Sequence, residues 1–328
     1  MSGNNENNYG WISTLRGFAA LLVFAAHLPI PWPHYLVGFA IGRAGVAIFF
    51  LIMGYLAVQA RQKRTRKQYL FNRFVRMYPV FWLILIATYI VKIIAWKASF
   101  FGHLKDLLFN ATLFNDFLGS GCIIGTSWMM PIQVVFFVIL AVLSVDFFEY
   151  ISGDMMEKIF IAGGGITVFI SLLRFITGKP LPTAFGLLLL LGLIGIQYHE
   201  YGDIRSISKY LEIFAIAFVP SVILSYKWEA IGYIVAYAAG IALFVLADEH
   251  KVSSEAMNKL GSVGFSFFLV SDIPHIILEK IIPMNYFVGT VIFIIIKFAA
   301  SLGLAYLLTM YVEKPMLKKA KAIEMSMK

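Results

Sequence analysis

Long apolar runs recur along this chain between short polar segments, and their length limits what the chain can fold into. Each run has roughly 17 to 25 residues, which is what an α-helix needs to cross about 30 Å of hydrocarbon. Backbone in hydrocarbon must satisfy its own hydrogen bonds, so such runs predict helices. We therefore predict an all-α fold, a polytopic membrane helical bundle of about ten transmembrane helices. The predicted spans are 12–29, 42–60, 77–96, 127–145, 158–177, 182–198, 208–225, 229–247, 260–279 and 287–312.

Composition supports a membrane protein and excludes several other classes. Hydrophobic residues make up 60% of the 328 residues and charged residues only 14%, whereas soluble proteins have about 25% charged residues. The net charge of +9 is compatible with nucleic-acid binding. In a chain this apolar, however, we attribute it to loops that face an anionic cytoplasmic leaflet, and we predict no nucleic-acid partner. The single cysteine, Cys122, excludes an intrachain disulfide and a cysteine metal cluster, and we predict no metal.

The charge distribution predicts the orientation in the membrane. Segment 61–76 contains seven Lys and Arg residues and no acidic residue, which marks it as cytoplasmic. Ten spans then place both termini in the cytoplasm. We predict a polar cytoplasmic leader at 1–11, a single transmembrane domain at 12–313 and a basic cytoplasmic tail at 314–328. The connection around 104–118 has apolar residues at helical spacing, which predicts an interfacial amphipathic helix or a cap.

The first span carries two ionisable residues, Arg16 and His27. They are eleven positions apart. Eleven helical steps amount to about 1100°, only about 20° past three turns, so both side chains share one stripe, roughly 16 Å apart. An ionisable residue in the membrane costs at least about 2.5 kcal/mol on insertion scales. Arg16 alone is explained by snorkelling to the interface, and His27 by its place near the outer surface. Together they predict an anion-binding group at a cytoplasmic entrance and a proton-handling group near the outer exit.

Two arginines, Arg73 and Arg76, stand three apart at the start of the third predicted span. Helical spacing places them on one face. They are either ordinary anchors at the cytoplasmic interface or a fork that holds phosphate or carboxylate.

Polar and small residues inside other spans have structural and functional explanations. Gly45 and Gly54 in the second span are typical of close helix packing. Gln133, in the fourth span after Trp128, is able to bridge helices by hydrogen bonding.

The last two spans contain further polar groups. Asp272 follows Ser271 and stands three residues before His275, so the sequence is compatible with a structural Asp–His pair or a working acid–base pair. Glu313 ends the last span, either as a helix cap or as part of a site.

Taken in order, these segments resemble the acyltransferase-3 family of integral membrane acyltransferases, from about Gly10 to about Lys319. The first span resembles its arginine–ten residues–histidine motif, the second its glycine–valine, Phe-Phe and glycine–aromatic signature, and the third its Arg-x-x-Arg motif. A tryptophan motif, a penultimate-span motif and a terminal glutamate–proline follow. The matching residues are Arg16, His27, Gly45, Val46, Phe49, Phe50, Gly54, Tyr55, Arg73, Arg76, Trp128, Gln133, Leu260, Gly261, Pro274, Glu313 and Pro315.

This chain departs from the family pattern at two places. The family often has glutamate where Gln133 stands, which puts an acid role there in doubt. It commonly has histidine where Ser271 or Asp272 falls, and His275 is an alternative replacement.

The resemblance implies transfer of an acyl group, usually acetyl, from acyl-CoA to a carbohydrate hydroxyl. Arg73, Arg76 and Arg16 would hold the phosphates of acetyl-CoA on the cytoplasmic side. The pantetheine arm would reach His27, because its extended length is similar to the roughly 16 Å helix rise. His27 would be the catalytic base. The residues expected to bind substrate or support the site are Trp128, Gln133, Ser271, Asp272, His275 and Glu313.

We expect a multi-pass protein of the bacterial inner membrane that contacts membrane lipid and a carbohydrate acceptor, a surface polysaccharide or glycolipid. A homo-oligomer and association with polysaccharide-synthesis partners are both open, as are the acceptor and the acyl group. Ten helices with buried charge also describe a transporter or flippase for an anionic or glycolipid substrate. Consumption of acetyl-CoA by purified protein would distinguish the enzyme from the transporter.

Overall fold

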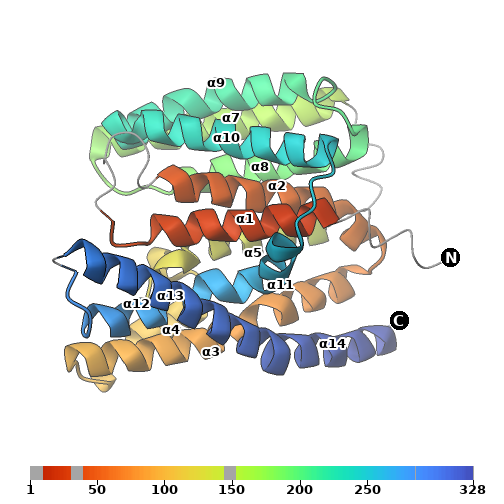
Figure 1. Ribbon diagram of the computed structural model, residues 1–328. Coiled ribbons are helices and arrows are strands. Elements are labelled where there is room, and N and C mark those ends of the chain that lie inside the picture. The colour runs from red at the N-terminus through yellow and green to blue at the C-terminus, as the bar shows by residue number, and fades with distance from the viewer. Residues whose placement is uncertain (1–9, 31–39, 144–152, 285, 328) are drawn as a thin grey trace.

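A computed structural model describes residues 10–30, 40–143, 153–284 and 286–327. Every regular element in these ranges is helical (Figure 1), so the predicted all-α fold is confirmed. The α-helices are α1 (Gly10–Ala26), α2 (Ala40–Gln62), α3 (Arg66–Trp96), α4 (Leu104–Ala111), α5 (Met130–Val142), α7 (Gly153–Thr177), α8 (Thr183–Tyr201), α9 (Ser208–Tyr226), α10 (Ala230–Glu249), α11 (Glu255–Val270), α12 (Asp272–Glu279), α13 (Phe287–Leu308) and α14 (Lys314–Ser326).

A polytopic bundle is also confirmed, while the count of ten spans stays a prediction. Among the residues described, seven helical stretches are long and apolar enough to cross a membrane, or eight if α11 and α12, bent by 49°, form one span. One of the seven, Ser208–Glu249, contains both α9 and α10. Helix α1 is apolar but has only 17 residues.

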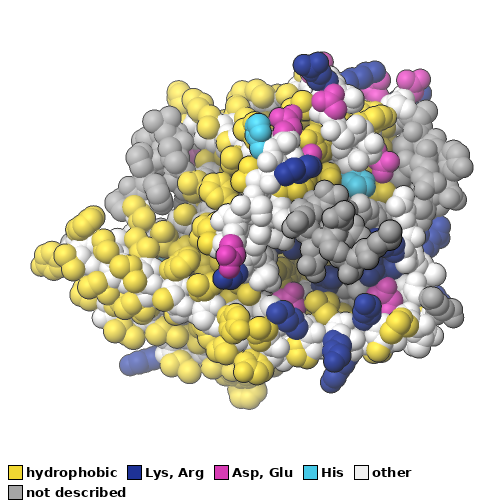
Figure 2. All heavy atoms as spheres, turned by 45° about the vertical axis from the view of Figure 1, so that its right-hand side comes forward, with side chains coloured by type: hydrophobic (Ala, Val, Ile, Leu, Met, Phe, Trp, Pro, Cys, Tyr) yellow, Lys and Arg dark blue, Asp and Glu magenta, His cyan; other side chains and the backbone are white. Residues whose placement is uncertain are grey.

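The helices form layers around α1 and α2. In Figure 1, α7, α9 and α10 cover one side of this pair, and α3, α13 and α14 lie on the other. Helix α1 packs against α2 and α11, and α2 also packs against α8 and α10. Helix α1 begins and α14 ends at the same end of the bundle. Figure 2 shows charged side chains gathered at that end and hydrophobic side chains covering the flank, as expected for a bundle with apolar surroundings.

Glycines set the closest approaches between these helices, as the packing interpretation of Gly45 and Gly54 predicts. A Cβ atom on Gly45 of α2 would lie 2.5 Å from the carbonyl oxygen of Ala19 on α1. A Cβ atom on Gly54 would collide with the carbonyl oxygen of Gly192 on α8. Because backbone atoms cannot rotate away, these contacts fix how closely α2 approaches its neighbours.

Helix α3 begins eleven residues before the predicted span. Thr65 and Gln68 form a capping box, with the Thr65 hydroxyl accepting from Gln68 N at 3.3 Å and the Gln68 side chain accepting from Thr65 N at 2.9 Å. This cap satisfies the free N–H groups of the first turn and begins the helix at Arg66. Arg73 and Arg76 therefore lie well inside a 31-residue helix.

The predicted basic tail is helical and attached to α3 over its described residues, 314–327. A π-helix, Thr309–Glu313, joins α13 to α14. Near the end of α14, the Glu324 carboxylate pairs with Arg64 Nε at 2.5 Å and accepts from Asn72 Nδ2 at 3.1 Å. These contacts hold the end of the chain close to the segment that carries Arg73.

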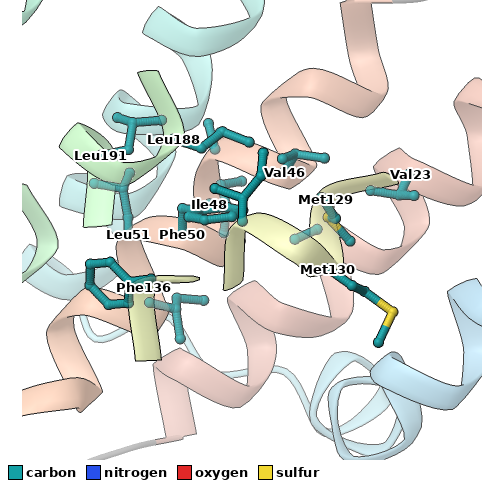
Figure 3. Close-up of a cluster of buried hydrophobic side chains, with 14 of the residues drawn as sticks. Val23, Val46, Ile48, Phe50, Leu51, Met129, Met130, Phe136, Leu188 and Leu191 are labelled. Carbon is teal, nitrogen blue, oxygen red and sulfur yellow. The ribbon is translucent and has the colours of Figure 1, made fainter. Parts of the chain in front are cut away.

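One cluster of buried hydrophobic side chains lies where α1, α2, α5 and α8 meet. Figure 3 shows Val23 of α1, Val46 of α2 and Met129, which ends the 3₁₀ helix Gly125–Met129 before α5. All three side chains are at most 3% exposed. Val23, Val46 and Met129 also line a pocket that contains His27.

Candidate active site

Five predicted site residues line one cavity of about 200 Å³, between α1, α2, α3, α5, α11 and the π-helix. We call it the arginine cavity. The predicted residues on its wall are Arg16, Arg73, Arg76, Gln133 and Glu313.

The two arginines of α3 are held in different ways. The guanidinium of half-buried Arg73 lies 5.0 Å from the centre of the Tyr69 ring and 4.7 Å from that of Phe137. Arg76 is exposed and donates from Nε to Asn72 Oδ1 at 3.2 Å. Cation–π contacts orient a guanidinium without using its N–H groups, and Arg73 Nε is buried with no hydrogen-bond partner among the residues described. Arg73 therefore has donors left for a ligand.

The charge in the arginine cavity is unbalanced. Glu313 is the one acidic residue on its described wall, against three arginines. No described carboxylate lies within 4.0 Å of Arg16, Arg73 or Arg76. Arginines that lack carboxylate partners in a partly enclosed site suit an anion with several oxygens, such as a phosphate.

A second, smaller pocket of about 60 Å³ contains His27 and Trp128, together with Arg43 and Thr126. We call it the histidine pocket. His27 Nδ1 lies 2.7 Å from the carbonyl oxygen of Val23. A carbonyl oxygen only accepts, so in this contact Nδ1 carries the hydrogen and Nε2 keeps its lone pair. The ring is thereby oriented, and Nε2 is the nitrogen able to take a proton.

The two cavities are stacked along the same helices. Arg16 of α1 lines the arginine cavity, and His27, the residue after α1, lines the histidine pocket. Helix α2 contributes Phe49 to the arginine cavity and Val46 to the histidine pocket. Val46 and Phe49 are three positions apart, which is a rise of about 4.5 Å. Helix α1 ends at Ala26, one residue before His27, and Arg16 and His27 do not share a cavity. Phe49 of α2 and Phe268 of α11 both line the arginine cavity, where their ring centres are 5.8 Å apart.

Ser271, Asp272 and His275 of the predicted ninth span lie outside both cavities, whereas Gly261 of the same span lines the arginine cavity. The helix bends at Ser271, whose hydroxyl donates to the Phe268 carbonyl at 2.8 Å. Asp272 accepts from the Gly125 N–H at 2.6 Å, while the His275 ring lies edge-on to Phe293. Among the residues described, Asp272 and His275 form no ion pair or hydrogen bond with each other. The predicted structural Asp–His pair is therefore not formed, because Asp272 binds the loop before α5.

Residues 9–310 match the family model described as an acyltransferase domain, that of the acyltransferase-3 family. The chain belongs to the acyltransferase-3 family. The match includes every residue named here on the walls of the two cavities except Glu313. No match was found among curated proteins or among solved structures. Because it belongs to this family and has several helices of membrane length, the chain is a multi-pass membrane acyltransferase.

Two cations of this acyltransferase were not predicted as site residues. Lys297 of α13 is fully buried, and its Nζ donates to the carbonyl oxygen of His27 at 2.7 Å. It lies 4.9 Å from the centre of the Phe24 ring. Lys297 therefore holds the end of α1 that carries the histidine. The sequence does contain a signal for this role, because a lysine in the middle of an apolar span marks a candidate functional residue.

Arg43 is the second such cation. Its guanidinium lies 4.2 Å from the centre of the Trp128 ring, on the wall of the histidine pocket. In the sequence it looks like an ordinary basic residue at a span boundary, so no signal distinguished it. Over the described part of the chain, no group of three or more His, Cys, Asp or Glu residues is placed to hold a metal ion.

Proposed function

We propose that this acyltransferase transfers an acetyl group from acetyl-CoA to a carbohydrate hydroxyl, with His27 as general base. The observation that carries the proposal is the stacking of an arginine-lined cavity and a histidine pocket along the same faces of α1 and α2. The arginine cavity suits the phosphates of acetyl-CoA, and the histidine pocket suits its thioester.

The arginine cavity is the proposed site for the phosphates of coenzyme A. Arg16, Arg73 and Arg76 would bind them by charge-assisted hydrogen bonds. We place this cavity at the cytoplasmic face of a bacterial inner membrane, with both termini on that side, because segment 61–76 is strongly basic. Acetyl-CoA would then enter from the compartment in which it is made.

The pantetheine arm is proposed to pass from the arginine cavity to the histidine pocket. Phe49 and Phe268 meet on the wall of the arginine cavity, and we place them on this path, so donor binding would require the two side chains to move apart. A rotation of two aromatic side chains is a small change compared with a helix movement, and it would keep water out until the donor is bound.

At the histidine pocket, His27 Nε2 would take the proton of the acceptor hydroxyl as its oxygen attacks the thioester carbon. The new C–O bond forms, the C–S bond breaks, and the thiolate of coenzyme A receives the proton from His27. The 60 Å³ pocket has room for about two waters, at about 30 Å³ each. That space accommodates an acetyl group better than a longer acyl chain.

His27→Ala tests the proposal. The purified variant is expected to bind acetyl-CoA normally in a calorimetric titration and to lose about 10²-fold or more of its transfer rate. His250→Ala is the matched control, because His250 is exposed beyond the end of α10. Mass spectrometry of cell-surface glycans, from cells with and without the chain, would reveal the product. Near-normal glycan acetylation by well-expressed His27→Ala protein would refute the role of His27.

A further inference from the structure

A continuous stack of aromatic rings and guanidinium groups leads away from the histidine pocket. The Arg43 guanidinium lies between the rings of Trp128, at 4.2 Å, and Tyr233, at 5.0 Å. The Tyr233 ring stacks on Tyr226 with centres 4.1 Å apart and planes within 16°. Arg174 lies 5.2 Å from the centre of the Tyr226 ring. We call these five residues the aromatic–arginine ladder.

The ladder lies at one end of the bundle, although its members come from five different elements. Arg43 is near the beginning of α2, Tyr233 near the beginning of α10, Tyr226 ends α9 and Arg174 is in the last turn of α7. His27 follows the last residue of α1, so it lies at this end, and Arg16 lies toward the other. The ladder is therefore beside the proposed proton-accepting group and away from the proposed phosphate site.

The two arginines of the ladder have unused binding capacity. A guanidinium has five N–H donors. Arg43 donates from Nη2 to the Tyr233 hydroxyl at 3.3 Å, and Arg174 donates from Nη1 to the Leu181 carbonyl at 3.0 Å. No other hydrogen bond to a described residue is formed by either guanidinium, and no described carboxylate lies within 4.0 Å of them. Both side chains are half-buried, so part of each remains accessible.

The composition of the ladder indicates a ligand class. Tyr233 is buried between Arg43 and Tyr226, but Trp128 and Tyr226 are only half-buried. The exposed parts of these two rings offer rigid apolar surface on which the C–H face of a sugar ring packs, with little entropy lost on binding. Guanidinium groups bind carboxylate or phosphate oxygens in pairs. Rings and unpaired cations together suit a ligand that has both a sugar ring and carboxylate or phosphate groups. We propose that the aromatic–arginine ladder binds an anionic carbohydrate and presents one of its hydroxyls to His27.

This inference rests on the proposed acetyl transfer and names the acceptor class: a sugar chain that carries carboxylate or phosphate groups. The competing explanation is that the ladder only ties α2, α7, α9 and α10 together through cation–π contacts. That explanation predicts a loss of stability in ladder variants but no preference for charged glycans.

The test uses an array of glycans that bear uronate, sialate, phosphate or no charge, probed with the detergent-solubilised full-length protein. Binding is expected to acidic members only and to weaken in 0.5 M NaCl. Arg43→Gln and Arg174→Gln are each expected to weaken it about 10-fold, since one charge-assisted contact is lost. Arg174→Gln, at the end of the ladder, keeps the test valid if Arg43→Gln does not fold. Arg205→Gln, an exposed arginine between α8 and α9, is the charge-matched control.

Consumption of acetyl-CoA by the wild type separates the two proposals. If the wild type neither binds nor consumes acetyl-CoA, the proposed function fails. If it does consume acetyl-CoA, the ladder proposal is overturned by equal binding of neutral glycans, by binding to no glycan, or by unchanged binding in both arginine variants. Preference for acidic glycans that is lost in these variants, while acetyl-CoA binding is kept, supports it.

Discussion

Gly45→Ala is expected to displace the two helices that form the histidine pocket. The added Cβ would lie 2.5 Å from the carbonyl oxygen of Ala19, 3.0 Å from Val23 Cγ2 and 3.2 Å from Leu22 Cβ. Real Cβ contacts essentially never fall below 3.0 Å, and a backbone oxygen cannot turn aside. Helices α1 and α2 must therefore separate by at least about 0.5 Å, judged from these contacts.

The displacement acts on a small site. Helix α1 leads into His27 and α2 carries Arg43, on the wall of a pocket of only about 60 Å³. A misplacement of about 1 Å is able to cost a reaction about 10²-fold, so a shift of half that size is expected to lower transfer roughly 10-fold. Overpacking is also expected to reduce the free energy of unfolding by about 1–3 kcal/mol.

Gly165→Ala in α7 is the matched control, because its Cβ would meet no atom within 4 Å. Both variants gain about 1 kcal/mol of helix propensity from the change of glycine to alanine. Only Gly45→Ala also introduces a steric clash, so the difference between the two variants measures the clash. Unfolding by sodium dodecyl sulfate in mixed micelles measures the difference between the variants, and acetyl transfer measures the effect on the site. Equal stability and equal activity of the two variants would refute the claim that this glycine contact sets the pocket.

Three further outcomes are expected. Arg73→Ala and Arg76→Ala should each raise the apparent dissociation constant for acetyl-CoA roughly 10- to 150-fold, from about 1.5–3 kcal/mol per charged hydrogen bond, with partial rescue by lysine; an unchanged constant in calorimetric titration would mean that these arginines only anchor the helix. Lys297→Met should lower transfer about 10-fold or more at unchanged donor affinity, because the bond to the His27 carbonyl is lost; kinetics with full activity would contradict this. Cys122 should react with a membrane-impermeant thiol reagent added from outside. The reaction should become faster as the pH rises, because burial raises the pKa of the Cys122 thiol and only the thiolate reacts. Labelling only in inverted vesicles would reverse the proposed orientation.

Helices and their faces were predictable from the sequence because they depend on neighbours along the chain. Apolar runs of membrane length predicted the bundle, and helical periodicity predicted that Arg16 and His27 share one stripe, although α1 ends one residue before His27. The early start of α3 was also encoded locally, since the Thr65 and Gln68 side chains form the box that caps it. Hydropathy alone placed the beginning of this span at residue 77, because several of the residues from Arg66 onward that follow the cap are polar or basic.

The contents of the site depended on how the helices approach one another. Helical spacing puts Asp272 and His275 on one face, yet Asp272 binds the Gly125 N–H of a distant loop instead. Lys297 reaches the His27 carbonyl across 270 positions of sequence, and the glycine contact of Gly45 sets the spacing between helices.

The division between the arginine cavity and the histidine pocket was likewise decided by tertiary packing. Phe49 of α2 and Phe268 of α11 meet on the wall of the arginine cavity, and the ladder forms only because four helix ends and the Trp128 segment converge. Periodicity fixes the direction of a side chain from its own helix axis, but its partners are chosen by backbone approach between segments far apart in the chain. The sequence alone therefore determined which residues face the interior, and the tertiary structure decided which of them meet.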